Sequence, residues 1–206
     1  MWMGCGYSGG ITLGEAWPKA ESARLEARII GPMAIVTLPD PCLVVLVGAA
    51  GSGKSTFASR NFASSQILSS DAYRVLVSGD PTDQSANAAA FTALHAALDR
   101  RLGDRLTSVI DATNLTRGAR RALVSRATGS GVAAVAIVLD LPYDQILGRN
   151  AARDRVVPED VVRYQLAQVR RLVDETILDR DGFEWIVILR DPREVDAVTM
   201  ASAPRG

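Results

Sequence analysis

A glycine-rich segment that follows a short apolar run constrains the fold of this chain more than any other feature. The apolar run 43–47 contains only leucine and valine, and it is followed by Gly48-Ala49-Ala50-Gly51-Ser52-Gly53-Lys54-Ser55-Thr56. In the pattern G-x-x-x-x-G-K-[ST], a buried strand ends in a loop whose backbone N–H groups surround a phosphate. The helix that follows adds the positive end of its dipole. The sequence therefore predicts a nucleoside triphosphate site at residues 48–56.

Two residues of this loop are expected to have individual chemical roles. Lys54 should contact the β- and γ-phosphates, and the hydroxyl of Ser55 should bind Mg²⁺. The remaining loop residues and Thr56 are expected to hold the nucleotide. ATP and Mg²⁺ are therefore the predicted cofactors.

Strands and helices alternate along the rest of the chain. Apolar runs at 66–70, 107–111, 132–139 and 185–189 predict further strands, with helical segments between them. Because these runs are continuous rather than alternating, they predict a parallel sheet with both faces covered. The expected fold is α/β, a P-loop NTPase with about five parallel strands sandwiched by helices and an arginine-bearing lid.

Composition excludes several classes of protein. Lys and Arg together number 23, as do Asp and Glu, so the molecule is not a general trap for polyanions and any nucleic-acid contact must be local. No window has the unbroken apolar length of a membrane span, so no membrane partner is expected. The two cysteines, Cys5 and Cys42, form no disulfide framework or metal spacing, which fits a reducing compartment. A cytoplasmic location is therefore expected.

Ligands of parallel sheets bind outside the carboxyl ends of the strands, and acidic residues lie at the ends of three of the predicted strands here: Asp71, Asp111 and Asp140. Asp71 and Arg74 are three residues apart at the start of a helix, so both project from one face. The carboxylate can accept a proton from an attacking hydroxyl, and the guanidinium can hold an anionic group of the substrate. The alternative is a helix cap with an intrahelical ion pair.

A second strand end carries Asp111 and Asn114. Asp111 is expected to help bind the substrate and is placed to orient Mg²⁺ or its waters, or alternatively to cap the next helix. Asn114 is expected either to bind substrate or to terminate the turn.

Arginines occur around a polar break between two helices. Arg149, Arg153 and Arg155 could close over the γ-phosphate and offset the charge that develops during transfer, or they could form a solvated face. A second group is expected to be a solvated helix face, with a polyanion-binding patch as the alternative: Arg117, Arg120, Arg121 and Arg126. His95 is expected to be a packing residue.

Four motifs in this order resemble the 5′-hydroxyl polynucleotide kinases. They are the loop 48–58, Ile67-Leu68-Ser69-Ser70-Asp71-Ala72-Tyr73-Arg74, Val109-Ile110-Asp111-Ala112-Thr113-Asn114, and Gly148-Arg149-Asn150 with Arg153. The sequence is most similar to the kinase module of bacterial polynucleotide kinase-phosphatase, an RNA-repair protein, and the similarity covers about 43–198. That protein also has phosphatase and adenylyltransferase modules, which this sequence does not contain, so a free-standing kinase or a fragment is expected.

The resemblance implies a role for each matching residue. Asp71 would be the general base on the 5′-hydroxyl, and Arg74 would hold the neighbouring substrate phosphate. Arg149 would contact the triphosphate in the transition state, while Arg153 and Arg155 would belong to the lid.

The residue pattern along the chain sets the expected domain boundaries, because the Gly-rich start has no lasting apolar period. Residues 1–32 are expected to be a poorly structured N-terminal tail in which part of 15–30 could form a short helix. Residues 33–200 are expected to be the P-loop kinase domain, beginning with an edge strand at 34–39. Residues 201–206 are expected to be a C-terminal tail.

The expected function is an ATP-dependent kinase that transfers the γ-phosphate to a 5′-OH end of RNA or DNA. One alternative is a small-molecule P-loop kinase of the gluconate, shikimate or antibiotic phosphotransferase type. The other is a regulatory ATPase. The sequence leaves open the preference between RNA and DNA, the choice of nucleotide donor and the oligomeric state.

Overall fold

The computed structural model of the protein describes residues 23–26, 34–152 and 156–203. Its centre is a six-stranded sheet in the order β1-β7-β6-β3-β5-β4, and every neighbouring pair is parallel. The strands are β1 Ala23–Glu26, β3 Cys42–Gly48, β4 Ile67–Ser69, β5 Ser108–Asp111, β6 Ala133–Leu139 and β7 Trp185–Leu189. The predicted α/β fold with a parallel sheet is therefore confirmed.

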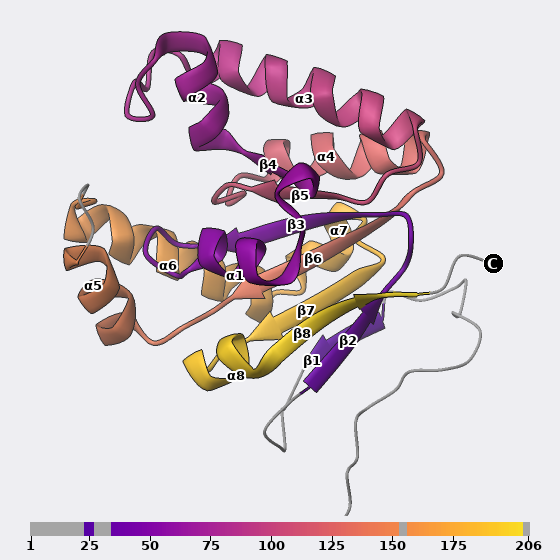
Figure 1. Cartoon of the computed structure of the whole chain (residues 1–206). Coiled ribbons are helices and arrows are strands. Elements are labelled where there is room, and N and C mark those ends of the chain that lie inside the picture. The colour runs from indigo at the N-terminus through magenta and orange to yellow at the C-terminus, as the bar shows by residue number, and fades with distance from the viewer. Residues whose placement is uncertain (1–22, 27–33, 153–155, 204–206) are drawn as a thin grey trace, which may run out of the picture.

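Helices cover both faces of this sheet (Figure 1). They are α1 Lys54–Asn61, α2 Ser70–Ser78, α3 Asn87–Gly103, α4 Arg117–Gly129, α5 Tyr143–Ala151, α6 Glu159–Asp174, α7 Ile177–Asp181 and α8 Pro192–Ala197, with a 3₁₀ turn at Ser64–Gln66. Side chains of α3, α4 and α7 pack on one face, and those of α1, α5 and α8 pack on the other. Helix α6 contributes to both clusters, through Val162 and Leu166 on one side and Val169 and Leu172 on the other.

The apolar run before the glycine-rich loop is buried because it is the central strand. All seven residues of β3 are buried, with Leu43, Val45 and Val47 in one core cluster and Val44 and Leu46 in the other. Burying one such side chain stabilises the fold by about 1.5–3 kcal/mol. The loop that follows therefore starts from a fully buried strand of the sheet.

Two segments near the predicted tails differ from expectation. Ala23–Glu26 is a strand that pairs with the edge strand β7, so the sheet has six strands and this part of 1–32 is neither helical nor poorly structured. The pairing uses the backbone N–H and C=O groups along β7, which would otherwise be an open edge of the sheet. Pairing of this kind is not specified by an apolar pattern in the sequence. The rest of the predicted N-terminal tail lies outside the described residues, as does Met33.

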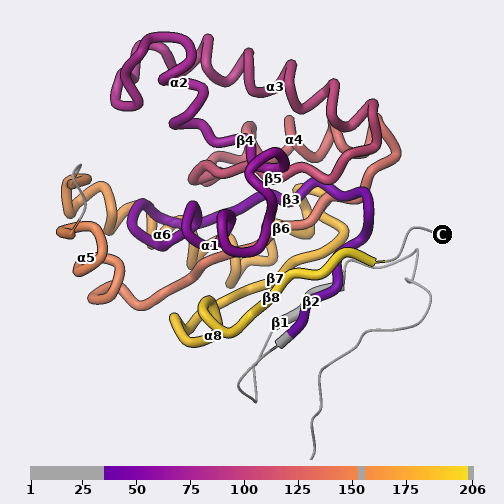
Figure 2. The backbone as a smooth tube through the Cα atoms, in the orientation of Figure 1, coloured from indigo at the N-terminus to yellow at the C-terminus, as the bar shows by residue number. Residues whose placement is uncertain are grey.

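The strand expected at 34–39 forms, but it does not join the main sheet. Strand β2, Ala34–Leu38, pairs in parallel with β8, Val198–Ser202, in a separate two-stranded sheet. Figure 2 shows these two strands, from opposite ends of the described chain, side by side. Ala201 and Ser202 therefore belong to a strand rather than to the predicted C-terminal tail. Within the described residues, no helix is both long and apolar enough to cross a bilayer.

The sheet brings three strand ends to the same edge. Ser69 at the end of β4 is in register with Asp111 at the end of β5, and the Gly48 N–H donates a hydrogen bond to the carbonyl of Thr113 over 3.3 Å. The loop after β3, the start of α2 and the turn after β5 are thus neighbours, as the strand-end argument predicts.

Candidate active site

The backbone of the loop after β3 has a shape that its glycines make possible. Gly51 and Gly53 have φ values of +82° and +90°, which side chains rarely allow. A Cβ atom on Gly48 would lie 2.7 Å from the Ser52 Oγ atom and 3.3 Å from the Leu139 carbonyl oxygen. The turn therefore needs glycine at the positions that the motif prescribes.

Lys54 is held in place by the loop itself. Its Nζ atom donates to the carbonyl oxygens of Gly48 at 3.0 Å and Ala49 at 2.8 Å, and the side chain is buried. An ammonium held by two backbone carbonyl partners keeps its position. This arrangement can present a positive charge to an anion with little rearrangement.

A first cavity, here called the donor cavity, has a volume of about 400 Å³ and lies over the loop and α1. Its lining residues are Gly51, Gly53, Lys54, Ser55, Thr56, Phe57, Arg60, Arg149, Val195 and Asp196. Arg60 forms an ion pair with Asp196 at 3.0 Å and donates to the carbonyl of Val195. Helix α8 is thereby joined to α1 at the rim of this cavity.

Helix α5 carries Arg149 to the loop. A Cβ atom on Gly51 would lie 3.0 Å from the Ile146 carbonyl oxygen, so helix and loop are in close contact. The Arg149 Nη1 atom would lie 3.4 Å from a Cβ atom on Gly53. The predicted partners Arg153 and Arg155 lie outside the described residues.

A second cavity, here called the acceptor cavity, has a volume of about 650 Å³ and lies between α2, α3, the turn after β5 and the start of α6. Its lining residues are Ala50, Lys54, Ser55, Ser70, Asp71, Arg74, Pro81, Thr82, Gln84, Asn87, Phe91, Asp111, Ala112, Thr113, Val156, Val157, Pro158, Val161 and Gln165. It shares Lys54 and Ser55 with the donor cavity. The two spaces therefore meet at the lysine and serine of the loop.

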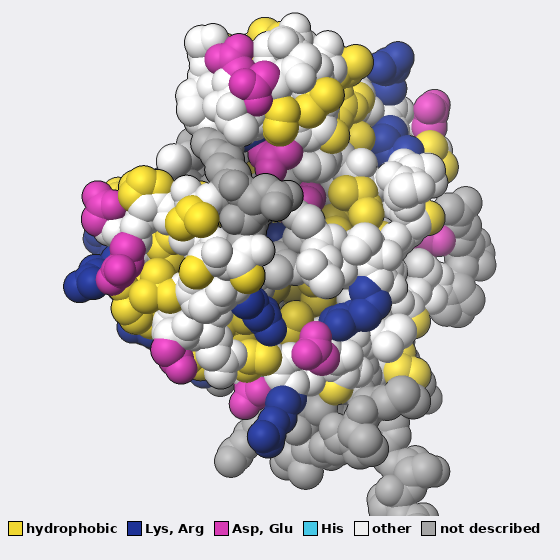
Figure 3. Space-filling model, turned by 60° about the vertical axis from the view of Figure 1, so that its left-hand side comes forward, with side chains coloured by type: hydrophobic (Ala, Val, Ile, Leu, Met, Phe, Trp, Pro, Cys, Tyr) yellow, Lys and Arg dark blue, Asp and Glu magenta, His cyan; other side chains and the backbone are white. Residues whose placement is uncertain are grey.

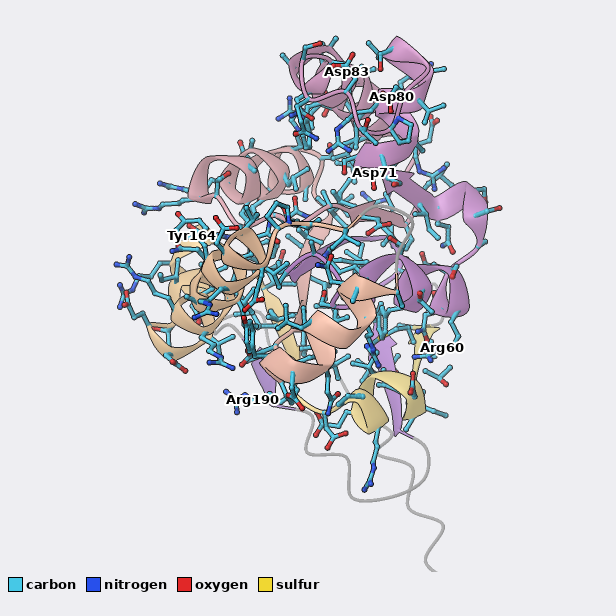
Figure 4. All side chains as sticks on the ribbon, turned by 90° about the vertical axis from the view of Figure 1, so that its left-hand side faces the viewer. Arg60, Asp71, Asp80, Asp83, Tyr164 and Arg190 are labelled. Carbon is cyan, nitrogen blue, oxygen red and sulfur yellow. The ribbon has the colours of Figure 1, made fainter. Side chains whose placement is uncertain are left out.

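Asp71 is open to the acceptor cavity and is oriented by Arg74. The Asp71 side chain is 60% exposed, whereas that of Arg74 is only 12% exposed. Arg74 donates to the Asp71 carboxylate, to Asn87 Oδ1 at 2.7 Å and to the carbonyl of Pro81 at 3.2 Å. Figure 4 shows Asp71 well apart from Asp80 and Asp83, the acids of the loop between α2 and α3. The intrahelical ion pair thus exists, and it lies inside a cavity beside the loop lysine.

The two predicted residues after β5 have different surroundings. Asp111 is buried and lines the acceptor cavity. Asn114 is also buried, but its amide donates to the carbonyls of Leu46 at 2.8 Å and Ala112 at 3.3 Å, and it is not among the lining residues. Its φ of +50° fits a residue that ends a turn. The geometry therefore favours the turn-forming alternative for Asn114.

Arg120 corrects the expectation of a solvated helix face. Its side chain is 1% exposed and forms an ion pair with the fully buried Asp181 at 2.6 Å. It also donates to the carbonyls of Asn114 and Leu115, at 3.2 and 2.6 Å. Arg120 therefore supports the turn after β5 from behind. Its spacing to Leu123 and Ala127, both buried on the same helix, was the signal for this position.

Three further residues of the site carry no motif. Phe91 lines the acceptor cavity, and its ring centroid lies 6.1 Å from that of His95, whose pKa is lowered by burial. Arg60 lies at the rim of the donor cavity, as described above. Gln165 on α6 accepts a hydrogen bond from the Ala50 N–H at 2.8 Å, across 115 residues of sequence.

The surface around the site has mixed charge. On the face that Figure 3 shows, basic and acidic side chains are interspersed and do not gather into one basic field. This matches the equal numbers of basic and acidic residues in the sequence. Any polyanion would therefore be bound through a few local contacts.

Residues 43–181 match the protein family described as AAA domain (AAA_33). The chain belongs to this family. This AAA domain is also similar to a chain in the structure of the Pnkp1/Rnl/Hen1 RNA repair complex, with 25% identity and a TM-score of 0.57 over 68% of this chain and 47% of that one. It spans about half the length of that relative. The resemblance that the motifs predict is thereby confirmed, at low identity.

Two further solved structures share the fold with this AAA domain. The AvrRxo1-ORF1:-ORF2 structure with ATP is 18% identical, with a TM-score of 0.52 over 68% of this chain and 50% of that one. A chain of the PezAT toxin-antitoxin system of Streptococcus pneumoniae is 14% identical, with a TM-score of 0.51 over 78% of this chain and 70% of that one. No curated protein matches the chain. The AAA domain therefore has a kinase-like P-loop fold, which implies nucleotide binding.

Proposed function

We propose that this AAA domain is an ATP-dependent polynucleotide kinase that phosphorylates a 5′-OH end of RNA or DNA. The observation that carries the proposal is the meeting of two cavities at Lys54 and Ser55, with Arg149 in one and Asp71 in the other. A phosphoryl group bound at the lysine would face an acceptor hydroxyl in the second cavity. Hydrolysis alone would not need an acceptor space of about 650 Å³.

The reaction divides between the two cavities. The acceptor hydroxyl oxygen forms a bond to the γ-phosphorus while the bond from that phosphorus to the β,γ-bridging oxygen breaks, and ADP leaves with the electron pair. The hydroxyl proton passes to the Asp71 carboxylate, which lies in the acceptor cavity. Lys54 and Arg149 offset the negative charge on the transferring group from the loop side.

Arg74 is suited to hold the phosphate that follows the terminal nucleoside. Its contacts to Asp71, Asn87 and Pro81 use Nε and Nη1, and Nη2 has no hydrogen-bond partner among the described residues. A guanidinium fixed by three contacts keeps its remaining donors in one direction. One side chain can therefore orient the base and bind the substrate.

Two residues of the acceptor cavity, Ser55 and Asp111, are suited to hold a magnesium ion. The exposed Ser55 follows the fixed lysine, and the buried carboxylate of Asp111 lines the same space. An alcohol oxygen and a carboxylate that can hold metal-bound waters fit Mg²⁺. When bound, the ion would neutralise charge on the phosphates.

The apolar side chains of the acceptor cavity favour a nucleotide over a sugar. Val156 and Val161 line the acceptor cavity although they are 57% and 37% exposed, and Phe91 lines it as well. Apolar side chains beside polar ones suit a nucleotide, whose base has apolar faces and whose sugar and phosphate are polar, whereas a sugar would leave the apolar side chains without a partner. This is the reason for proposing a nucleic-acid end instead of the small-molecule alternatives.

The test is an acceptor screen with labelled ATP and Mg²⁺. The wild-type chain should phosphorylate a 5′-OH oligonucleotide and not gluconate, shikimate or an aminoglycoside. Asp71→Asn should lower this transfer by at least about 100-fold while ATP binding is preserved.

Asp160→Asn is the matched control, because Asp160 also lies in the first turn of a helix but lines neither cavity. It should transfer like the wild type. Transfer to a sugar but not to the oligonucleotide would refute the proposed substrate. Near-normal transfer by Asp71→Asn would refute the proposed base.

A further inference from the structure

Gln165 reaches the phosphate loop from a distant helix. It lies on α6, where Val162 and Leu166 on neighbouring positions are buried in the core. Its Oε1 atom accepts a hydrogen bond from the backbone N–H of Ala50 at 2.8 Å. Because α6 is anchored by its apolar side, the position of this amide is fixed relative to the loop.

The contact with Ala50 determines how the amide is oriented. A backbone N–H can only donate, so the oxygen of the Gln165 side chain must face Ala50. The Nε2 group is therefore on the other side of the amide, and it has no hydrogen-bond partner among the described residues. Gln165 lines the acceptor cavity together with Lys54 and Asp71.

These positions surround one space with groups of complementary chemistry. Lys54 supplies a positive charge, Asp71 supplies a proton acceptor, and Gln165 supplies a neutral donor with two hydrogens. Arg149 lines only the donor cavity, so the amide is a donor on the acceptor side. A phosphoryl group that moves from the donor cavity to the acceptor cavity would pass between these side chains.

We propose that Gln165 is a catalytic residue whose Oε1 fixes the Ala50 peptide and whose Nε2 donates a hydrogen bond to a non-bridging oxygen of the transferring phosphoryl group. The assignment rests on the proposed phosphoryl transfer but not on the nature of the acceptor. A donor that is oriented before the reaction stabilises the transition state more than the ground state.

The experiment compares three variants of the full chain: Gln165→Met, Gln165→Glu and Gln168→Met. Methionine keeps the length of the side chain and removes both polar groups, while glutamate keeps the acceptor for Ala50 and removes the donor. Gln168 lies on the same helix but lines neither cavity, so its variant is the control. The measurements are the affinities for ATP and for ADP with aluminium fluoride and Mg²⁺, a mimic of the transferring group, together with kcat and KM for transfer.

Gln165→Met should lower kcat and the affinity for the fluoride mimic by about 100-fold, with a much smaller change in ATP affinity. Gln165→Glu should lose at least as much, because a carboxylate would face the phosphoryl oxygens. Gln168→Met should match the wild type.

Two results would overturn the assignment. One is wild-type affinity of Gln165→Met for the fluoride mimic, and the other is wild-type kcat of Gln165→Glu, which folds with its contact to Ala50 retained. A wild-type chain that phosphorylates no oligonucleotide, but whose mimic affinity still depends on Gln165, would refute only the proposed substrate.

Discussion

The donor and acceptor cavities share Lys54 and Ser55 but are built in different ways. The donor cavity is formed mainly by consecutive residues of the loop and α1, with Arg149 and α8 added at its sides. The acceptor cavity is assembled from α2, α3, the turn after β5 and α6, which are far apart in the sequence. Local sequence therefore encodes the binding of the nucleotide, whereas tertiary packing creates the space for the acceptor.

The largest effect on this comparison is expected from removing Arg149 from the donor cavity. Arg149→Ala should lower kcat for 5′-OH transfer by about 1,000-fold or more, because an arginine that stabilises a transferring phosphoryl group is worth about 10³–10⁵ in rate. Steady-state transfer to an oligonucleotide measures the effect.

Arg163→Ala removes an exposed arginine that pairs with Glu159, and it serves as the control. Its transfer rate should be that of the wild type. Equal rates for Arg149→Ala and the wild type would show that the two cavities do not cooperate through this side chain.

The stability of the turn after β5, which lines the acceptor cavity, should depend on the buried ion pair between Arg120 and Asp181. Arg120→Met leaves the fully buried Asp181 without its closest cation, so the free energy of unfolding should fall by about 3–5 kcal/mol. Urea denaturation measures this change. Combining it with Asp181→Leu should restore much of the stability, since no charge then remains buried.

Arg121→Met is a suitable comparison, because Arg121 is exposed on the same helix. Its unfolding free energy should stay close to that of the wild type. A similar loss in both variants would contradict a special role for the buried pair.

The smallest effect is expected at the rim of the donor cavity. Arg60 is held there by Asp196 and by the Val195 carbonyl, in a place where its guanidinium can contact a nucleobase. Arg60→Ala should raise KM for ATP about two- to fivefold without lowering kcat, since a cation–π contact at an exposed site is worth about 0.5–1 kcal/mol.

Arg193→Ala on α8 is the control, because Arg193 is exposed and lines neither cavity. A change in kcat rather than KM for Arg60→Ala would place Arg60 nearer to the chemistry than this comparison allows.

The same contrast explains what the sequence could predict. The loop 48–56 depends on neighbouring residues, so its glycines and Lys54 follow from one motif. Asp71 and Arg74 are also local, three residues apart on one helix, and Asp111 follows from its place at a strand end.

Residues defined by long-range contacts could not be found in this way. Gln165 reaches Ala50 from 115 residues away, and nothing in its own helix distinguishes it from Gln168. The spacing of Arg120 to Leu123 and Ala127 marks it as a buried position, but its partner on α7 cannot be read from the sequence. Asn114 is held by the carbonyl of Leu46 on β3, which is also distant in the sequence. Strand β1 is four residues long and pairs with β7 through backbone groups, which no motif in the sequence specifies.

The separate rims of the two cavities have a consequence for kinetics. Arg60 and Asp196 border one opening, while Thr82 and Asp71 border the other, and all four side chains are exposed. In the proposed transfer, either substrate would then enter without displacing its counterpart, which favours a ternary complex over a covalent phosphoenzyme relay. Double-reciprocal plots at several fixed concentrations of the second substrate should accordingly intersect rather than run parallel.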